Sequence, residues 1–433
     1  MRILLVTQYW APENGVPQRR WAWLSKVLER AGHEVAVLAP PPHYLRQGGW
    51  GDWWRSKGYR FKLEQGSEAN GHRLVLRSGF IPGGASISQK VLNQIGVAAG
   101  GLWVVLRRNS PISAYNPDLI IGTIPALPTA LVAVVASWRF KVPYVVDLRD
   151  AWPDLLSVAD HWNAAIGNAS MRQIILSKGP LQAVTLATDR ILNRILSNAG
   201  AILSTSGDLA EDLSRRYRKP PPIWPIRNVF PPETQISKSV DVRDSNADLK
   251  VLYAGTLGRA QNLSNALVAA YLAEMEGVRV KLRFVGAGAA KRELVQIARK
   301  LKVDATFEKR RGAEQLAECY QWADTALVHL TDWPPLERAV PSKTYELMSQ
   351  GLHISGVVRG ETRELIERLN AGHSVDPEEP VQLARLWIEL ARDRSKLWVS
   401  DMGAEWVRKQ REIQAPANLL DCIQHFESVE AND

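Results

Sequence analysis

The sequence predicts an α/β protein of two domains, each built on a parallel β-sheet with helices on both faces. Three observations lead to this prediction. The chain has 433 residues, which is long for one domain and ordinary for two. Short apolar strands alternate with helices in both halves, as in parallel sheets that are buried on both faces. A proline-rich segment, 220–232, interrupts this alternation midway.

The first half opens with an apolar strand pattern at 2–7, and a helix with apolar residues on one face follows at 18–30. Gly32 ends this helix. Further strands and helices are predicted, in chain order, at 34–39, 118–122, 126–140, 144–148, 201–205 and 208–217.

The alternation restarts after the prolines. Strands and helices are predicted, in chain order, at 250–254, 262 onward, 280–285, 289–301, 325–330, 342–350 and 353–357. We therefore place the first domain in 1–219, the linker in 220–239, the second domain in 240–410, and a helix that returns to the first domain in 411–433. Two Rossmann-like domains of this kind bind ligand in a cleft between them, at the carboxyl ends of their strands.

Composition excludes several classes of protein. The hydrophobic share of 45% and the charged share of 23% are those of a globular protein, not of collagen, a coiled coil or a disordered chain. The only cysteines, Cys319 and Cys422, are too few for a disulfide framework or a cysteine zinc site, and we expect a cytoplasmic location. No targeting signal is evident, and the apolar stretches 97–106 and 126–138 are shorter than the ~20 residues that cross a bilayer.

The basic excess belongs to the first half. Residues 1–200 contain 22 Lys and Arg against 12 Asp and Glu, whereas the whole chain has a net charge of +9. A one-sided basic domain favours an anionic partner such as nucleic acid, a phosphorylated substrate or acidic lipid. The alternative is a solvated surface that serves solubility.

Glycines follow two predicted strands of the second half. Gly286 and Gly288 end a strand and precede a helix, where backbone N–H groups can meet a phosphate. The dinucleotide-binding fingerprint needs a small residue at position 291, but this position is lysine. The alternative interpretation is that these glycines only form a tight turn between strand and helix. Gly255 and Gly258 flank another strand end, and Arg259 follows, so that amides and a guanidinium could hold a diphosphate together. No Walker A loop, H-E-x-x-H motif or histidine cluster indicates a metal.

The segment 340–351 is the second candidate for ligand binding. Pro341 and Ser342 start a predicted helix, and Lys343 adds positive charge there. Glu346 lies one turn further, where a carboxylate can accept hydrogen bonds from two sugar hydroxyls. In the alternative interpretation Ser342 is a helix cap and Glu346 an ordinary surface residue. The combination of these segments favours ligand binding.

In this combination the chain resembles glycosyltransferase family 4 over nearly its whole length, and especially the branch that builds bacterial capsule, colanic-acid-type or O-antigen polysaccharides. The segments that carry the resemblance are the Gly15 loop, 32–35, 147–153, 255–262, 286–288, 320–324 and 341–351. The resemblance implies an α/β GT-B architecture, with two Rossmann-like domains facing each other across a cleft. It also implies retaining transfer of a sugar from a nucleotide diphosphate, without a metal or cofactor.

The resemblance assigns roles in donor binding. Gly15 matches the glycine loop that approaches the diphosphate, Arg259 the arginine that neutralises it, and Glu346 the ribose-binding glutamate of the family's E-x7-E motif. The usual lysine after Arg259 is absent, so we expect Lys343 to supply its charge. Arg338 replaces the first glutamate of the motif, which affects contacts to the transferred sugar. The predicted donor-binding set is Gly15, Arg259, Gln261, Asn262, Gly286, Gly288, Ser342, Lys343, Thr344 and Glu346.

We predict Arg149 and Asp150 as catalytic residues. By the resemblance, Arg149 takes the place of a histidine found near the reaction centre in many relatives. Asp150 could bind a hydroxyl or receive the acceptor proton. The departing phosphate can also take that proton in this class, so a protein base is not required. The alternative is that Asp150 only caps a helix in a tight turn.

Residues 50–62 interleave aromatic and basic side chains, four of them Lys or Arg. Such residues favour the headgroup level of an anionic membrane. The predicted membrane or acceptor contacts are Trp50, Trp53, Trp54, Arg55, Lys57 and Arg60. The segments 91–103 and 181–196 could add amphipathic helices on a membrane, with core packing as the alternative. The same chemistry can bind single-stranded nucleic acid, but no nucleic-acid module is recognisable and we expect none as partner.

The sequence therefore predicts a retaining, metal-independent glycosyltransferase at the inner leaflet of the cell membrane. Its donor would be a nucleotide-diphosphate sugar, with UDP expected on family grounds and GDP as the alternative. Its acceptor would be a polyprenyl-diphosphate-linked glycan in bacterial surface polysaccharide synthesis. Two other functions fit the two-domain plan: a nucleotide-sugar 2-epimerase, and a non-catalytic nucleotide-sugar-binding partner suggested by the missing first glutamate.

Overall fold

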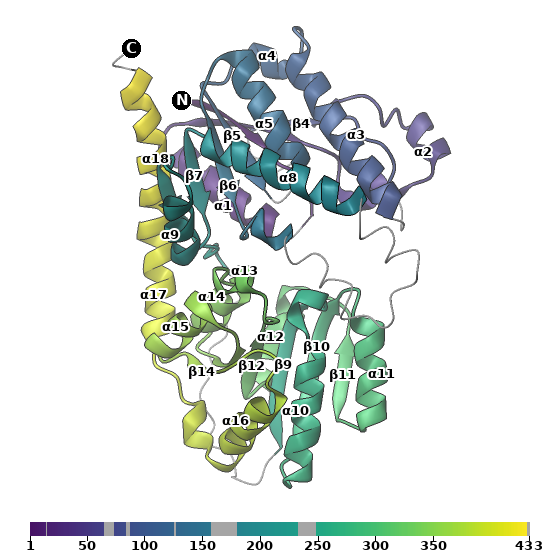
Figure 1. The fold of residues 1–433 in the computed structure, drawn as a ribbon, viewed down its shortest axis with the longest axis vertical. Helices are drawn as coiled ribbons and strands as arrows, with labels where there is room; N and C mark the ends of the chain where they lie inside the picture. Colours follow the sequence, from purple (N-terminus) through teal and green to yellow (C-terminus); the bar gives the residue numbers. More distant parts are fainter. Residues whose placement is uncertain are drawn as a thin grey trace. The chain divides into compact units, whose positions relative to one another are not determined.

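The computed structural model describes residues 1–13, 15–64, 73–83, 87–124, 127–156, 180–232 and 248–430. These residues form two compact units, each with its own sheet and core (Figure 1). In the described part, the first unit comprises 1–156, 180–230 and 413–430, and the second comprises 231–412. No helix among these residues combines the length and the apolar character that crossing a membrane requires.

Among the described residues, the first unit has an eight-stranded sheet in the order β3-β4-β2-β1-β5-β6-β7-β8. All its ladders are parallel except that of β3 with β4. The central strands are buried along most of their length and mostly apolar, because helices cover both faces. The strands are β1 (Arg2–Val6), β2 (Glu34–Ala39), β3 (Lys62–Glu64), β4 (Leu74–Arg77), β5 (Leu119–Ile124), β6 (Tyr144–Leu148), β7 (Ala201–Ser204) and β8 (Ile223–Pro225).

The helices of the first unit include one from the far end of the chain. In α18 the buried side chains recur at helical spacing, at Leu419, Cys422, Ile423 and Phe426, and this stripe packs against α1 and β8 (Figure 1). The helices and turns are α1 (Val16–Arg30), η1 (His43–Gln47), α2 (Trp50–Arg55), α3 (Ile87–Leu106), α4 (Pro111–Tyr115), α5 (Leu127–Phe140), η2 (Asp154–Leu156), α8 (Pro180–Ser197), α9 (Gly207–Arg216) and α18 (Ala415–Glu430).

The second unit has a six-stranded, wholly parallel sheet in the order β11-β10-β9-β12-β13-β14 in its described residues. Its strands are β9 (Leu249–Thr256), β10 (Val280–Ala287), β11 (Ala305–Glu308), β12 (Thr325–His329), β13 (His353–Val357) and β14 (Gly372–Val375). Its helices and turns are η3 (Arg259–Gln261), α10 (Ser264–Met275), α11 (Lys291–Leu301), α12 (Ala313–Trp322), α13 (Pro334–Glu337), α14 (Ser342–Ser349), α15 (Gly360–Arg368), α16 (Pro380–Arg392), η4 (Arg394–Leu397), α17 (Met402–Lys409) and η5 (Gln410–Gln414).

The structure corrects the predicted linker. Ile223–Pro225, which we placed in the linker 220–239, is strand β8 and pairs with β7. Proline is tolerated there because β8 is an edge strand. The first unit therefore reaches Phe230 rather than residue 219. Residues 233–247 lie outside the described residues.

Candidate active site

Parallel topology brings the candidate residues of each unit to one edge of its sheet. In a parallel sheet every crossover helix starts on the side where the strands end. In the second unit, η3 follows β9, Gly288 follows β10, and α14 begins after β12. In the first unit, Arg149 and Asp150 directly follow β6. The carboxyl edges of the two sheets therefore hold the predicted donor-binding and catalytic residues.

Glu346 is held on both of its carboxylate oxygens. Tyr320, from the neighbouring helix α12, donates its hydroxyl to Glu346 Oε1 at 2.7 Å. Lys343, one turn earlier on α14, donates from Nζ to Glu346 Oε2 at 2.9 Å and to the Tyr320 hydroxyl at 3.0 Å. Tyr320 is buried, so it fixes the carboxylate to the body of the unit. A carboxylate oxygen has two lone pairs, so a single hydrogen bond does not exhaust its capacity to accept.

The structure shows the surroundings of three further predicted residues of α14. Lys343 does not stand free at the helix start, because its ammonium is already paired with Glu346. Thr344 is completely buried, and its hydroxyl finds no hydrogen-bond partner in the described part of the chain. Its side chain belongs to the packing under α14 and not to a ligand surface. Ser342 is the first residue of the helix and Pro341 its N-cap.

Gly286, at the end of β10, and Gly288, just after it, have a packing role. A Cβ at Gly286 would overlap the carbonyl oxygen of Gly255, its partner in the sheet. A Cβ at Gly288 would overlap the carbonyl oxygen of Leu257 in the same way. Gly286 is buried, whereas Gly288 is exposed. Of these two glycines, only Gly288 can therefore offer its backbone to a ligand. Both positions lack a side chain because the backbone at the end of β9 passes too close to them.

The turn after β9 is fixed by local contacts. Asn262 has a positive φ of 34° and accepts a hydrogen bond from Ser264 at 2.7 Å, which makes it part of the turn into α10. The Ala260 carbonyl accepts from the Thr331 N–H at 3.0 Å, which ties the turn to the residues after β12. Gln261 lies in η3 and is half-buried. Arg259 begins η3, but its side chain lies outside what the structure describes, so its role stays a prediction.

Arg338 follows the short helix α13 and caps its carboxyl end. It stands where the resemblance places the first glutamate of the E-x7-E motif. Glu337, one residue earlier, packs closely, since a Cβ at Gly360 would overlap its carbonyl oxygen. An arginine therefore stands at the position that the motif gives to a carboxylate, and its role toward the transferred sugar stays a prediction.

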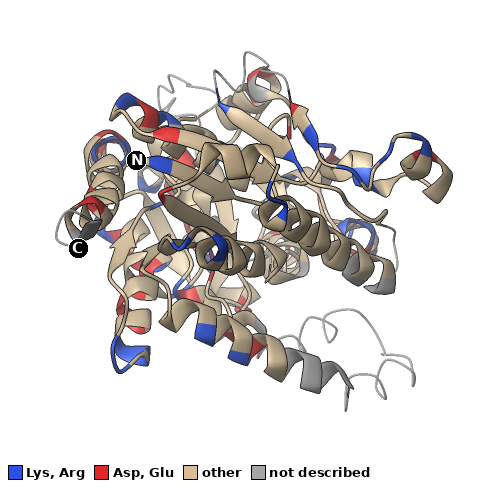
Figure 2. Cartoon of the chain, turned by 90° about the horizontal axis from the view of Figure 1, so that it is seen from above, with Lys and Arg blue, Asp and Glu red and all other residues tan. Residues whose placement is uncertain are grey.

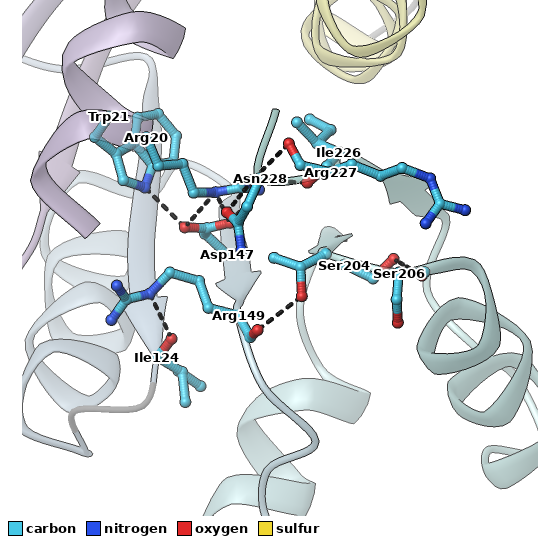
Figure 3. Close-up of polar contacts among 11 residues, drawn as sticks. Arg20, Trp21, Ile124, Asp147, Arg149, Ser204, Ser206, Ile226, Arg227 and Asn228 are labelled. Carbon is cyan, nitrogen blue, oxygen red and sulfur yellow. Dashed lines mark hydrogen bonds and ion pairs between the residues drawn. The ribbon is translucent and has the colours of Figure 1, made fainter. Parts of the chain in front are cut away.

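In the first unit, a buried ion pair lies beside the predicted catalytic residues (Figure 3). Arg20 Nη2 lies 2.8 Å from Asp147 Oδ1, and neither side chain is exposed. Trp21 donates to Asp147 Oδ2 at 2.7 Å. Arg20 Nη1 also donates to the Ile226 carbonyl at 2.6 Å and to Asn228 Oδ1 at 3.1 Å. This cluster joins α1, β6 and the segment after β8.

Sequence reasoning missed Arg20, although a signal was present. Arg20, Leu24 and Leu28 follow at intervals of four on α1, and all three are buried. A charged residue on the apolar stripe of a helix indicates a buried partner. Tyr320, by contrast, offered no comparable signal, because its partners lie on another helix.

Arg149 and Asp150 differ sharply in exposure. Arg149 is buried, donates from Nε to the Ile124 carbonyl at 3.2 Å, and accepts at its own carbonyl from the Thr205 hydroxyl at 2.7 Å (Figure 3). Burial lowers the pKa of Arg149, and Asp147 and Asp150 oppose this. Asp150 is exposed. Loss of hydration raises the pKa of its carboxyl and Arg149 lowers it, but solvent contact limits that rise. Asp150 is therefore the member of the pair that a substrate can reach.

Gly15 is the N-cap of α1, in extended conformation. A Cβ there would lie 2.6 Å from Gln18 Oε1, an atom that is buried. The absence of a side chain at Gly15 thus leaves room for the Gln18 amide, and an approach of Gly15 to the diphosphate stays a prediction.

The aromatic segment folds as α2 and a turn. Trp53 is half-buried and donates from Nε1 to the Phe80 carbonyl at 2.6 Å. It therefore anchors the segment, whereas we had predicted it as a membrane or acceptor contact. Trp50 and Trp54 project, with exposures of 58% and 68%, and both rings contact Trp53. Arg55, Lys57 and Arg60 are exposed.

Solved structures with the same two-unit fold are glycosyltransferases and related enzymes. Sucrose-phosphate synthase from Thermosynechococcus elongatus is 15% identical with a TM-score of 0.67, and all of both chains is covered. Anabaena HepE in complex with UDP and glucose is 16% identical with a TM-score of 0.62, over 99% of this chain and 100% of that one. The lipopolysaccharide outer core galactosyltransferase WaaB is 12% identical with a TM-score of 0.58, over 98% and 99%. No curated protein sequence matches the chain.

The fold is therefore the α/β GT-B fold. Two family models match the sequence: one described as a glycosyl transferase 4-like domain covers residues 15–228, and one described as glycosyl transferases group 1 covers residues 237–407. The chain belongs to the glycosyltransferases that combine these two domains.

Proposed function

We propose that this enzyme transfers a sugar from a nucleotide-diphosphate sugar, expected to be a UDP-sugar, to a lipid-linked glycan in bacterial surface polysaccharide synthesis. The transfer would retain the anomeric configuration and need no metal. The observation that carries the donor assignment is the fixed carboxylate of Glu346 beside Lys343 at the start of α14, on the carboxyl edge of the second sheet. HepE, in complex with UDP and glucose, supports a UDP donor.

In this proposal the second unit binds the nucleotide. Glu346 accepts two ribose hydroxyls, and Tyr320 and Lys343 orient its carboxylate. The first N–H groups of α14 and the amide of Gly288 face the diphosphate, with Arg259 as the cation that stabilises the leaving group. The paired Lys343 contributes little net charge, because its ammonium is balanced by Glu346.

The first unit supplies the acceptor side. Asp150 is solvent-exposed at the end of β6 and would bind an acceptor hydroxyl, while the buried Arg149 positions the turn that carries it. WaaB acts on lipopolysaccharide by its name, and this supports a lipid-linked acceptor. The basic excess of residues 1–200 suits a diphosphate-linked lipid.

The test uses purified protein, a panel of UDP-, GDP- and dTDP-sugars, and a polyprenyl-diphosphate-linked acceptor, with magnesium or with a chelator. We expect a thermal upshift with one nucleotide base and sugar transfer in both conditions. Glu346→Ala and Arg259→Ala should each lower turnover by about tenfold or more, since each removes a charged contact to the donor. The matched controls, Glu314→Ala and Arg292→Ala, change exposed residues of the same unit and should transfer normally.

Other outcomes would contradict specific parts of the proposal. Near-normal rates in both Glu346→Ala and Arg259→Ala would refute the donor site. Conversion of the free nucleotide sugar to its epimer without an acceptor would favour the 2-epimerase. Nucleotide binding without hydrolysis or transfer would favour a non-catalytic partner. Loss of transfer on chelation would refute metal independence.

A further inference from the structure

The outward face of α3 is apolar. Between residues 92 and 106, the exposed side chains of this helix carry no charge and no hydrogen-bonding group other than the Trp103 indole N–H; they are Leu92, Ile95, Ala99, Trp103 and Leu106. Their spacing of three or four residues places them on one side of the helix. Trp103 is 61% exposed and Ile95 is 57% exposed. A surface helix of a water-soluble domain normally presents polar residues on this side.

Packing within the unit explains only the opposite face of α3. Val97, Val104 and Val105 are buried toward the core, where α3 packs against α5. Gly100 lets the segment before α3 approach closely, since a Cβ there would overlap the Gly79 carbonyl oxygen. The helix is thus apolar on the side that the core covers and apolar again on the side that it leaves uncovered.

Exposed apolar side chains also occur on two neighbouring helices. On α5, which packs against α3, Leu131 and Trp138 are exposed. On α8, which packs against α5, Leu186 and Ile191 are exposed. Three helices that pack in series therefore all expose apolar side chains, and large exposed apolar patches mark contacts with a protein or a membrane.

Cations border this surface. Arg107 and Arg108 follow the last turn of α3, and both are exposed. The exposed Arg55, Lys57 and Arg60 belong to α2 and the turn after it. This segment and α3 are both hydrogen-bonded to residues 80–81: Trp53 donates to the Phe80 carbonyl, and Asn93 of α3 donates to the Ile81 carbonyl at 2.6 Å. Between residues 92 and 106 α3 contains no Lys, Arg, Asp or Glu, and in Figure 2 blue and red positions lie together on the short helix α2 at the edge of the unit.

We propose that the outward face of α3 enters the interfacial layer of an anionic lipid bilayer, with Trp50 and Trp54 of α2 beside it at headgroup level. Helices that bind in the interfacial layer of a membrane combine an apolar face with tryptophans and flanking basic residues, as α3 and α2 do. Each cation near an anionic membrane surface raises the binding constant about fivefold. A protein partner would not require the basic border. The inference deepens the proposed function, since it names the surface at which a lipid-linked acceptor is met.

The experiment is flotation with vesicles of phosphatidylglycerol and phosphatidylcholine, compared with vesicles of phosphatidylcholine alone. The wild-type chain should float with the anionic vesicles, and less so in high salt. The double variant Ile95→Glu with Trp103→Glu should lose binding by about tenfold or more, because charged side chains would have to enter the apolar layer. The matched control is Trp398→Glu, at a tryptophan of the second unit that is 59% exposed, and it should float like the wild type.

Circular dichroism melting and the nucleotide thermal shift are measured on every variant in the absence of vesicles. Both should be unchanged in the double variant, so a loss of flotation is not a loss of folding or of the donor site. Wild-type protein that binds no vesicle, or a double variant that floats normally, would overturn the inference. So would a wild-type dimer in light scattering that the double variant abolishes, since the face would then join two copies. A chain that floats but binds no nucleotide would contradict only the proposed function.

Discussion

Arg20 and Asp147 form an ion pair that is fully buried although the two residues are 127 positions apart in the chain. The Arg20 Nε and Nη2 atoms both donate to Asp147 Oδ1, at 3.1 and 2.8 Å. Trp21 and Asn228 complete the hydrogen bonding of the pair. Through this pair the helix that begins at the Gly15 loop is fixed to the strand that ends before Asp150. A buried charge without its partner is costly, so the pair is a sensitive point of the first unit.

We expect Asp147→Asn to lower the free energy of unfolding of the first unit by about 3–5 kcal/mol, because it leaves the Arg20 guanidinium buried without a counter-charge. The Arg20→Met, Asp147→Asn double variant should lose less than the sum of the two single variants. Urea unfolding followed by circular dichroism measures this. Asp52→Asn, at an exposed pair with Arg55, is the control and should change little. Additive losses would show that the two side chains do not act as a pair.

Tyr320→Phe should weaken nucleotide-sugar binding by roughly tenfold, because it removes the hydroxyl that holds Glu346 Oε1 and accepts from Lys343. The ring and its burial remain, so the melting temperature should move by only a few degrees. Titration calorimetry with the nucleotide sugar identified by thermal shift measures the dissociation constant. Tyr271→Phe, at a half-exposed tyrosine of α10, is the matched control. An unchanged dissociation constant for Tyr320→Phe would mean that the Glu346 carboxylate needs no support.

His329 should make the stability of the second unit depend on pH. It lies at the end of β12, and burial lowers its pKa to about 3. In the unfolded chain the imidazole takes up a proton below its ordinary pKa of about 6.5, whereas in the folded chain it does not. Stability is therefore complete above about pH 6.5 and falls as the pH drops towards 3, by up to about 1.4 kcal/mol per pH unit.

Urea unfolding of the wild type and of His329→Gln between about pH 4 and 8 measures this contribution. The variant should show a flatter dependence of the unfolding free energy on pH. His43→Gln, at an exposed histidine of the first unit, should retain the wild-type slope. Parallel curves for the wild type and His329→Gln would contradict the prediction.

Gly288→Ala should destabilise the second unit by about 1–3 kcal/mol, since the new Cβ would overlap the Leu257 carbonyl oxygen and push the two loops apart. The same movement should displace the turn that carries Arg259 and raise the Michaelis constant for the donor. Gly51→Ala is the control: nothing lies near its Cβ position in α2, so it should be neutral or slightly stabilising. Full stability of Gly288→Ala would show that the loops can move apart freely.

Much of the fold followed from the sequence alone. Strands such as β1, β5 and β6 are mostly apolar, and helices follow them, because a parallel sheet is covered on both faces. The short edge strands β3, β8, β11 and β14 were not predicted. They have three or four residues each and bury fewer side chains, so their sequences carry little pattern. The prolines in and around β8 led us to predict a linker there instead of a strand.

For the candidate site too, some features could be predicted from the sequence and others could not. The sequence indicated which segments reach the carboxyl edges of the sheets, because strand ends, glycines and helix starts are local features. It determined that Gly288, Glu346 and Asp150 lie at such positions. Only the tertiary structure decided that Lys343 is paired with Glu346, that Thr344 is buried and that α3 turns an apolar face outward. These properties depend on which side chains of other elements pack nearby, and one-dimensional spacing does not encode contacts between residues far apart in the chain.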